Sequence, residues 1–228
     1  MTQVDVIVFD LDDTLFPERD FVLGGFRAVS DWLQQHWGVT GFFEAAWALF
    51  NTGTRDRIFD RTLDRFDIPY TPDLIRRLVQ IYRDHSPELM LFPDAQWALD
   101  FYCPQRKLGL ITNGYLRTQK NKVQALGIAD RFDALLYCDQ FGREHWKPSP
   151  LAYQKLMESL SCDGAACVYI GDHAEKDFIA PKQLGWHTIR IQRRGGEFET
   201  LRTTADQDAE FCVSSLYDLD PLLNELQP

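Results

Sequence analysis

The chain has 228 residues, and its content of 45% hydrophobic and 25% charged residues is that of an ordinary globular protein of one or two domains. Its 24 basic and 34 acidic residues give a formal net charge of −10, which disfavours binding to nucleic acids and anionic membranes. No apolar run approaches the ~20 residues that span a bilayer, and the first residues lack the features of a signal peptide. We therefore expect a cytoplasmic protein with no nucleic-acid and no membrane partner.

Short apolar runs rich in β-branched residues predict five buried parallel strands. Amphipathic segments separate them, such as the one that ends at Gly127, a typical helix C-cap. Alternation of strand and helix predicts the α/β class, with a doubly wound, Rossmann-like parallel sheet. In chain order, the predicted strands are Val4–Phe9, Leu108–Thr112, Ala134–Cys138, Ala166–Ile170 and Thr188–Ile191.

Residues 17–88 interrupt this alternation with helical patterns and no convincing strand. Phe59, Leu63 and Phe66 recur at helical spacing, and Thr71-Pro72-Asp73 is a helix start signal. We expect an all-helical domain at 17–88, inserted into a core of residues 1–16 and 89–228. Its many aromatic residues are expected to form its core, and the sheet is expected to resume near Leu91-Phe92-Pro93.

The five cysteines fit a reducing compartment, because they are odd in number and match no zinc-binding spacing. Several lie in apolar segments, so we expect buried free thiols. These residues are Cys103, Cys138, Cys162, Cys167 and Cys212.

Polar residues follow the predicted strands. Asp10 and Asp12 end the first strand and, being two apart, point the same way. Thr112-Asn113-Gly114 follows the second strand, where a hydroxyl, an amide and a glycine turn can bind a phosphate, although Asn-Gly is also a common turn. Gly171-Asp172 and Asp177 follow the fourth strand. Ligands of such sheets bind at the carboxyl ends of the strands, so we expect these side chains to converge.

Lys147 precedes a helix that starts at a proline, and alone it would be an ordinary solvated lysine. In order along the chain, the motifs Asp-x-Asp, Thr-Asn-Gly, Lys-Pro and Gly-Asp-x-x-x-x-Asp resemble those of the haloacid dehalogenase superfamily. The closer resemblance is to its phosphatases that carry a helical cap after the first strand. It implies a magnesium-dependent phosphatase (phosphoric monoester hydrolase) acting on a small phosphorylated metabolite: a sugar phosphate, a nucleotide or a phospho-acid.

The resemblance also implies a role for each motif residue. Asp10 matches the nucleophile that forms an aspartyl-phosphate, Asp12 the general acid and base, and Lys147 the cation that offsets negative charge. Two further groups of residues are implied by the match. Phosphate is bound by Thr112, Asn113 and Gly114, and Mg²⁺ is held by Asp10, the backbone carbonyl of Asp12, Asp172 and Asp177.

Other activities stay open at this point. A dehalogenase of the superfamily would lack the carboxylate at Asp12, whereas a phosphomutase or phosphotransferase would retain it. Phosphonate cleavage requires a cap lysine, and this chain has no lysine before Lys107. A receiver-like phospho-acceptor module would lack the helical insertion, and a non-catalytic scaffold would not preserve every motif.

Substrate selection is expected to depend on the inserted domain. Arginines and aspartates alternate over residues 55–65, which favours a solvent-exposed helix with surface ion pairs. A sharper hypothesis assigns Arg55 or Arg57 to an anionic group of the substrate. The oligomeric state is left open by the sequence.

Overall fold

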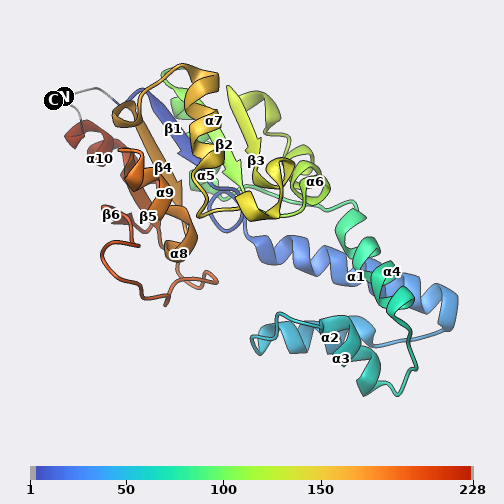
Figure 1. Ribbon diagram of the computed structural model, residues 1–228. Helices are drawn as coiled ribbons and strands as arrows, with labels where there is room; N and C mark the ends of the chain where they lie inside the picture. The colour runs from blue at the N-terminus through green and yellow to red at the C-terminus, as the bar shows by residue number, and fades with distance from the viewer. Residues whose placement is uncertain (1–3, 227–228) are drawn as a thin grey trace. The chain divides into compact units, whose positions relative to one another are not determined.

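The computed structural model describes residues 4–226 (Figure 1). The chain forms two compact units. The first, here called the core unit, comprises the chain up to Pro17 and from Met90 onward. The second, here called the helical unit, comprises Glu18–Leu89.

The core unit is built on a six-stranded sheet in the order β3-β2-β1-β4-β5-β6. Every neighbouring pair is parallel, so the predicted doubly wound α/β sheet is confirmed. The five expected strands are present with ends shifted by one or two residues, and β6 at the sheet edge was not expected. The strands are β1 (Val6–Phe9), β2 (Lys107–Thr112), β3 (Ala134–Tyr137), β4 (Cys167–Gly171), β5 (His187–Ile191) and β6 (Phe211–Val213).

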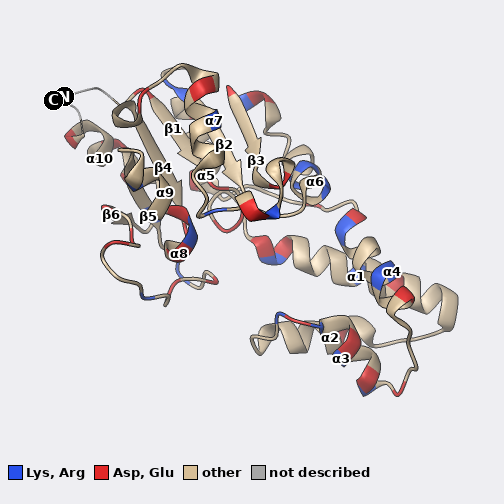
Figure 2. Ribbon diagram, viewed as in Figure 1, with Lys and Arg blue, Asp and Glu red and all other residues tan. Residues whose placement is uncertain are grey.

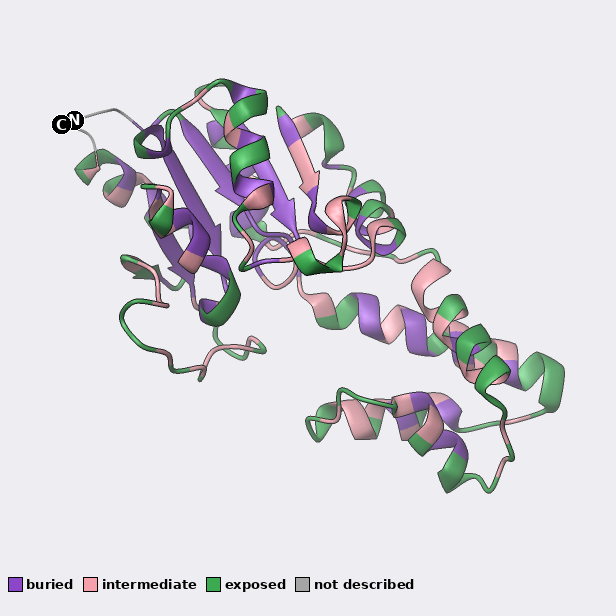
Figure 3. Cartoon of the chain, in the orientation of Figure 1, coloured by how far each residue is buried: buried purple, intermediate pink, exposed green. Residues whose placement is uncertain are grey.

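Helices flank this sheet (Figure 1). Side chains of β1 and β4, including Val8 and Tyr169, pack against Tyr153 and Leu156 of α7 in one buried apolar cluster. The central strands are buried on both faces (Figure 3), as expected of a doubly wound sheet. The core helices are α5 (Pro93–Tyr102), α6 (Leu116–Leu126), α7 (Leu151–Leu160), α8 (Ala174–Asp177), α9 (Ile179–Gln183) and α10 (Leu219–Glu225).

The segment Leu91–Pro93 corrects one expectation. It leads into helix α5 and forms no strand, so the prediction that the sheet resumes there was wrong. Pro93 occupies the first turn of the helix. A backbone N–H at this position would have no partner within the helix, so proline loses nothing there, and its fixed φ suits the helix. The backbone N–H of Phe92 donates to the carbonyl of Leu15 at 2.9 Å, which joins the two segments of the core unit.

The helical unit contains α1 (Glu18–Trp37), α2 (Phe42–Asn51), α3 (Ile58–Arg65) and α4 (Pro72–Asp84). Thr71 caps α4, since its hydroxyl accepts a hydrogen bond from the Leu74 N–H at 3.3 Å. Phe42 and Leu78 are fully buried in an apolar cluster to which all four helices contribute. Most of the aromatic residues pack into this cluster, but Trp37 stays 47% exposed.

The cysteines are all free, but the expectation that they are buried holds for Cys138 and Cys167 alone. Cys103 and Cys162 are half-buried, and Cys212 is exposed. Cys212 lies on β6, an edge strand whose second residue faces away from the core. Within residues 4–226, no helix is both long and apolar enough to cross a membrane.

Candidate active site

The strand order of the sheet reverses between β1 and β4, and ligands of such sheets bind at this switch point. Asp10 directly follows β1, and Asp172 directly follows β4. The Asp10 N–H donates to the carbonyl of Ile170 at 2.8 Å, which extends the pairing of the two strands. The first and last sequence motifs therefore meet where the fold places a ligand.

Three buried carboxyl groups form a cluster at this point. Asp10, Asp172 and Asp177 each offer an oxygen atom within 4.8 Å of the other two. The N–H of His173 donates to Asp177 Oδ2 at 2.9 Å and orients that carboxylate. A Cβ atom at Gly171 would lie 2.4 Å from the same oxygen. A glycine before Asp172 thus makes room for the close approach of Asp177.

Lys147 reaches the same cluster from the loop before α7. Its Nζ donates to Asp10 Oδ1 at 2.5 Å and to Asp177 Oδ1 at 2.7 Å. A third hydrogen bond, of 2.9 Å, joins it to the hydroxyl of Tyr169. Lys147 is 6% exposed. It is therefore no solvated lysine, and its ammonium group is fixed between two carboxylates.

Asn113 connects this lysine to the end of β2. The N–H of Lys147 donates to Asn113 Oδ1 at 2.8 Å, and Asn113 Nδ2 donates to the Lys147 carbonyl at 3.2 Å. This pair of hydrogen bonds fixes the backbone that carries the ammonium group. The amide of Asn113 thus acts on Lys147, which the sequence did not indicate.

The electrostatics of the cluster follow from its burial. Burial raises the pKa of Asp10 to about 7, with Lys147 opposing the shift and the charges of Asp177 and Asp12 adding to it. Burial likewise raises the pKa of Asp172 well above its usual range. Burial alone would lower the pKa of Lys147, but Asp10 and Asp177 raise it well above its ordinary value.

The donor set of this cluster fits a hard divalent cation. Lys147 contacts Asp10 and Asp177, and Asp172 offers a further oxygen beside them. When ionised, these three carboxylates outnumber the single ammonium group, which leaves an excess of negative charge away from bulk water. Mg²⁺ prefers oxygen ligands, and a charge of two balances this excess. Asp10, Asp172 and Asp177 are therefore the residues that could hold Mg²⁺.

Asp12 lies beside the cluster, with partners of its own. Lys122 Nζ donates to Asp12 Oδ1 at 2.6 Å, and Gln119 Nε2 donates to Asp12 Oδ2 at 2.8 Å. Neither residue was predicted from the sequence. A signal existed, because Gln119 and Lys122 continue the helical stripe of Val123 and Leu126 and thus occupy positions that face the core.

Thr112 and Gly114 also meet Gln119. Thr112 ends β2 and is 1% exposed; its hydroxyl accepts a hydrogen bond from Gln119 Nε2 at 2.6 Å and donates to the Asn113 carbonyl at 3.2 Å. Gly114 has φ +122°, and a Cβ atom there would lie 2.9 Å from Gln119 Cδ. The second motif is thus within reach of Asp12.

A family model of haloacid dehalogenase-like hydrolases matches residues 4–185. The chain belongs to this family. The prediction of a haloacid dehalogenase-like hydrolase is therefore confirmed, and with it the prediction of an enzyme.

Several relatives of this hydrolase are named phosphatases, in agreement with the predicted phosphatase type. A glyceraldehyde 3-phosphate phosphatase of Methanocaldococcus jannaschii is 26% identical over 97% of both chains. A phosphoserine phosphatase of Thermus thermophilus is 23% identical, covering 82% of this chain and 88% of its own length. An N-acylneuraminate-9-phosphatase of Rattus norvegicus is 29% identical over 53% of this chain and 46% of its own.

Solved structures of the family share this fold. A phosphatase of Thermococcus onnurineus superposes with a TM-score of 0.64 at 23% identity, covering 96% of this chain and 97% of its own. A 2-haloacid dehalogenase of Pseudomonas syringae superposes with a TM-score of 0.67 at 24% identity, covering 98% and 99%. Because a phosphatase and a dehalogenase match equally well, the fold by itself does not select the reaction.

The arginines expected to bind substrate belong to the helical unit of this hydrolase. Arg55 Nη1 donates to the Phe50 carbonyl at 2.7 Å, and its guanidinium group lies 4.0 Å from the centre of the Phe50 ring. Arg57 pairs with Asp60 at 3.2 Å. Acidic and basic residues alternate along the segment that contains α3 (Figure 2). These contacts agree with the simpler expectation of surface ion pairs, and substrate binding by Arg55 or Arg57 stays a prediction.

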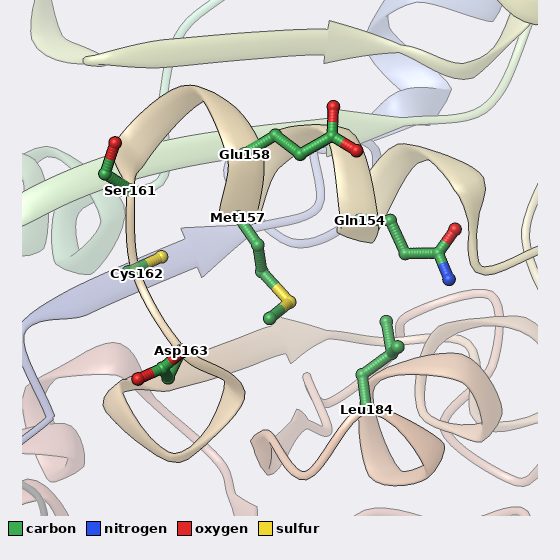
Figure 4. A pocket seen from close by; sticks show the side chains of 7 residues that line it. All are labelled: Gln154, Met157, Glu158, Ser161, Cys162, Asp163 and Leu184. Carbon is green, nitrogen blue, oxygen red and sulfur yellow. The ribbon is translucent and has the colours of Figure 1, made fainter.

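A hollow of about 600 Å³ lies elsewhere on the core unit (Figure 4). Its lining includes Cys162 and Asp163, which precede β4 in the chain, whereas Asp172 follows the end of that strand. No predicted site residue lines it, so it is not part of the acidic cluster. Its lining residues are Gln154, Met157, Glu158, Ser161, Cys162, Asp163 and Leu184.

Proposed function

We propose that this hydrolase is a magnesium-dependent phosphatase that hydrolyses a small phosphate monoester through an aspartyl-phosphate. The observation that supports it best is the convergence of Asp10, Asp172, Asp177 and Lys147. An anionic nucleophile that attacks a phosphate dianion faces strong repulsion. A site with a lysine and a cation-binding cluster around the nucleophile is suited to reduce that repulsion.

In the first step, a carboxylate oxygen of Asp10 attacks phosphorus, and the bond from phosphorus to the ester oxygen breaks. Asp12 donates a proton to the departing oxygen, which leaves as an alcohol. In the second step, Asp12 takes a proton from water as the water oxygen attacks phosphorus. Inorganic phosphate leaves, and the Asp10 carboxylate is restored.

The remaining residues hold the phosphate group. Lys147 offsets the charge on Asp10 and the phosphate, and Thr112, Asn113 and Gly114 would bind the phosphate oxygens. Asn113 would act through its backbone N–H, because its side-chain amide is bonded to the Lys147 backbone. Asp10, Asp172 and Asp177 would hold Mg²⁺ together with the Asp12 carbonyl. When bound, the ion would neutralise charge on the phosphate and orient it for attack.

The substrate that we propose is a small phosphorylated metabolite, with glyceraldehyde 3-phosphate as the first to test. Relatives of that name align over almost the whole of this chain. Phosphoserine and other small phosphate esters come next, because relatives with other named substrates also match. Asp12 favours phosphoryl transfer over dehalogenation, since halide leaves without a proton whereas an alcohol requires one.

The test is hydrolysis of a panel of phosphate monoesters by the purified chain, with and without Mg²⁺. We expect magnesium-dependent release of inorganic phosphate, and an aspartyl-phosphate that can be trapped by borohydride reduction. Asp10→Asn preserves the shape of the side chain but removes the nucleophile, so kcat should fall by at least about 1,000-fold.

Asp5→Asn is the matched control. It makes the same change next to the other end of β1, at an exposed residue, and should leave kcat unchanged. Failure to hydrolyse any ester of the panel, or full activity of Asp10→Asn, would contradict the proposal. Transfer of the phosphoryl group to an added alcohol in preference to water would instead identify a phosphotransferase.

A further inference from the structure

Two buried polar side chains of α6 hold the carboxyl group of Asp12. Lys122 lies 2.6 Å from one carboxyl oxygen and Gln119 lies 2.8 Å from the other. They are 2% and 1% exposed, and they project from the same side of the helix because they are three residues apart. Two donors on two oxygens fix both the position and the rotation of this carboxyl group.

The carboxyl group is held from the interior and remains accessible on its other side. The Asp12 side chain is 20% exposed, whereas the Lys122 side chain is 3% exposed. Asp12 follows Asp10 by two residues at the carboxyl end of the sheet. A molecule bound at the acidic cluster can therefore meet Asp12 without displacing either of its donors.

Stability alone is a weak reason for a buried lysine here. An ion pair that is removed from water pays a large desolvation cost, and apolar side chains of similar volume are often as stabilising. Val123, the next residue of α6, is itself buried, so an apolar side chain suits this part of the helix. Lys147 already contacts Asp10 and Asp177. Lys122 is therefore a second lysine at the site, and its carboxylate partner is Asp12.

Gln119 also connects Asp12 to the second motif. Its Nε2 donates to Thr112 Oγ1 at 2.6 Å as well as to Asp12. The absence of a side chain at Gly114 leaves the space for the Gln119 amide, since a Cβ atom there would lie 2.9 Å from its Cδ. Gln119 thereby fixes the position of Thr112, at the end of β2, relative to Asp12, which follows β1.

We infer that Lys122 and Gln119 are positioning residues that aim the Asp12 carboxyl group, first at the leaving oxygen and then at water. This inference rests on the proposed function, in which Asp12 is the acid and then the base. Proton transfer by a well-placed side chain contributes about 100- to 10,000-fold to rate, and part of that depends on orientation. Neither Lys122 nor Gln119 needs to touch the substrate.

The test compares Lys122→Met and Gln119→Met with the unaltered chain on two esters in Mg²⁺. Propyl phosphate releases a poor leaving group that requires a proton, whereas p-nitrophenyl phosphate releases an ion that does not. For propyl phosphate we expect kcat to fall by about 100-fold with KM within about threefold.

For p-nitrophenyl phosphate, the rapid first turnover should stay within about threefold, because expulsion of nitrophenolate does not use Asp12. The later steady-state rate should fall, since Asp12 must still activate water. A role limited to stability would reduce both phases and both esters together.

Lys120→Met is the matched control, because Lys120 is an exposed lysine on the same helix and should give unchanged kinetics. Asp12→Asn sets the largest loss that mispositioning can cause. Circular dichroism and thermal unfolding check that the variants fold. If Lys122→Met does not fold, Gln119→Met, which removes no charge, carries the test alone.

The inference is overturned if folded Lys122→Met and Gln119→Met turn over propyl phosphate at the unaltered rate. It is also overturned if the first turnovers of both esters fall equally. If the unaltered chain hydrolyses neither ester, an alkyl phosphate from the panel that it does hydrolyse and the nitrophenyl ester closest to it in structure take their place. A chain that hydrolyses none of these esters contradicts the proposed function itself, and the positioning role with it. The supporting result is a first turnover that becomes slower for propyl phosphate and stays within about threefold for p-nitrophenyl phosphate.

Discussion

The core unit and the helical unit differ in what they bury. The core unit encloses charged groups, among them Asp10, Lys147 and Asp177, each in contact with a partner of opposite charge. In the described part of the helical unit, Thr62 is the buried polar residue, and its hydroxyl donates to the Ile58 carbonyl. Charged groups there lie outside, over an apolar and aromatic core (Figures 2 and 3).

In this chain, most of the buried charged groups gather around the acidic cluster, and Asp94 is a buried charge that lies outside it. Removing charged groups from water is costly and contributes little net stability, whereas apolar burial stabilises directly. Substitutions in the core unit should therefore act mainly on catalysis, and those in the helical unit on stability.

Replacement of Lys147 should remove most of the activity. Lys147→Met removes the ammonium group between Asp10 and Asp177, and we expect kcat to fall by about 100- to 1,000-fold. Steady-state hydrolysis of p-nitrophenyl phosphate measures it. Lys155→Met, at a half-exposed lysine of α7 paired with Glu158, is the control and should be active. Retention of more than about a tenth of the unaltered kcat would argue against a catalytic role.

Truncation of Leu78 should affect stability. Leu78 is fully buried in the core of the helical unit, so Leu78→Ala should lower the free energy of unfolding by about 3 kcal/mol through lost contacts and a cavity. Urea unfolding followed by tryptophan fluorescence measures the loss. Gln80→Ala, at an exposed position of the same helix, should cost far less. Equal effects of the two would mean that this cluster does not stabilise the unit.

Asp94 provides a buried charge of the core unit that lies outside the acidic cluster. It accepts hydrogen bonds from Arg193 Nη1 at 3.0 Å, Ser215 Oγ at 2.9 Å and Leu216 N at 2.8 Å. Burial by itself raises the pKa of Asp94, but these hydrogen bonds and the charge of Arg193 outweigh it, so the pKa is lowered.

Because the pKa of Asp94 is lower in the folded than in the unfolded chain, its stabilisation is complete above the unfolded value of about 4. It is lost as the pH falls through the folded pKa. Asp94→Asn should therefore cost about 2 kcal/mol at neutral pH, with the difference shrinking in acid. Urea unfolding over a pH series measures it, and a difference that does not depend on pH would contradict the ion pair.

Gly171→Ala should weaken cation binding without changing the fold. The added Cβ would collide with Asp177 Oδ2, at 2.4 Å, and displace that carboxylate. We expect Mg²⁺ affinity to fall about tenfold, as is typical when a group that orients a metal ligand is disturbed. Isothermal titration calorimetry measures it directly. Unchanged affinity would remove Asp177 from the set of metal ligands.

Arg57→Ala should have the smallest effect on stability. Arg57 pairs with Asp60 at the surface, and such pairs contribute little, so Tm should stay within about 2 °C. Its kinetics decide between the two interpretations of this segment. An unchanged KM indicates a surface ion pair, whereas a KM raised about tenfold at constant kcat would identify substrate binding.

Much of the core could be predicted because its signals are local. The apolar run that ends at Phe9 predicts a buried strand, and Asp10 directly after it predicts a carboxylate at the sheet end. The edge strand β6 escaped prediction, because three residues with an exposed Cys212 in the middle do not form an apolar run. Leu91–Phe92 resembled a strand, but Pro93 and the residues after it form a helix.

The site was predictable where motifs mark it and unpredictable where partners come from elsewhere in the chain. Lys147 was found as part of a motif, but its contact with Tyr169 depends on the fold. Gln119 and Lys122 are more than 100 residues from Asp12 in sequence. Polar residues on a helix are usually exposed, and only the packing of α6 shows that these two are not.

The hydrogen bond between Phe92 N and Leu15 O has a consequence for replacing the helical unit by protein engineering. It brings together the two points where the core's backbone departs for the helical unit and returns from it. Insertions are best tolerated where both ends are already adjacent at the surface of a domain. The helical unit should therefore be replaceable. With a short turn in place of residues 18–89, the core unit should still form its sheet, and a different insert could be placed there with the carboxyl cluster left intact.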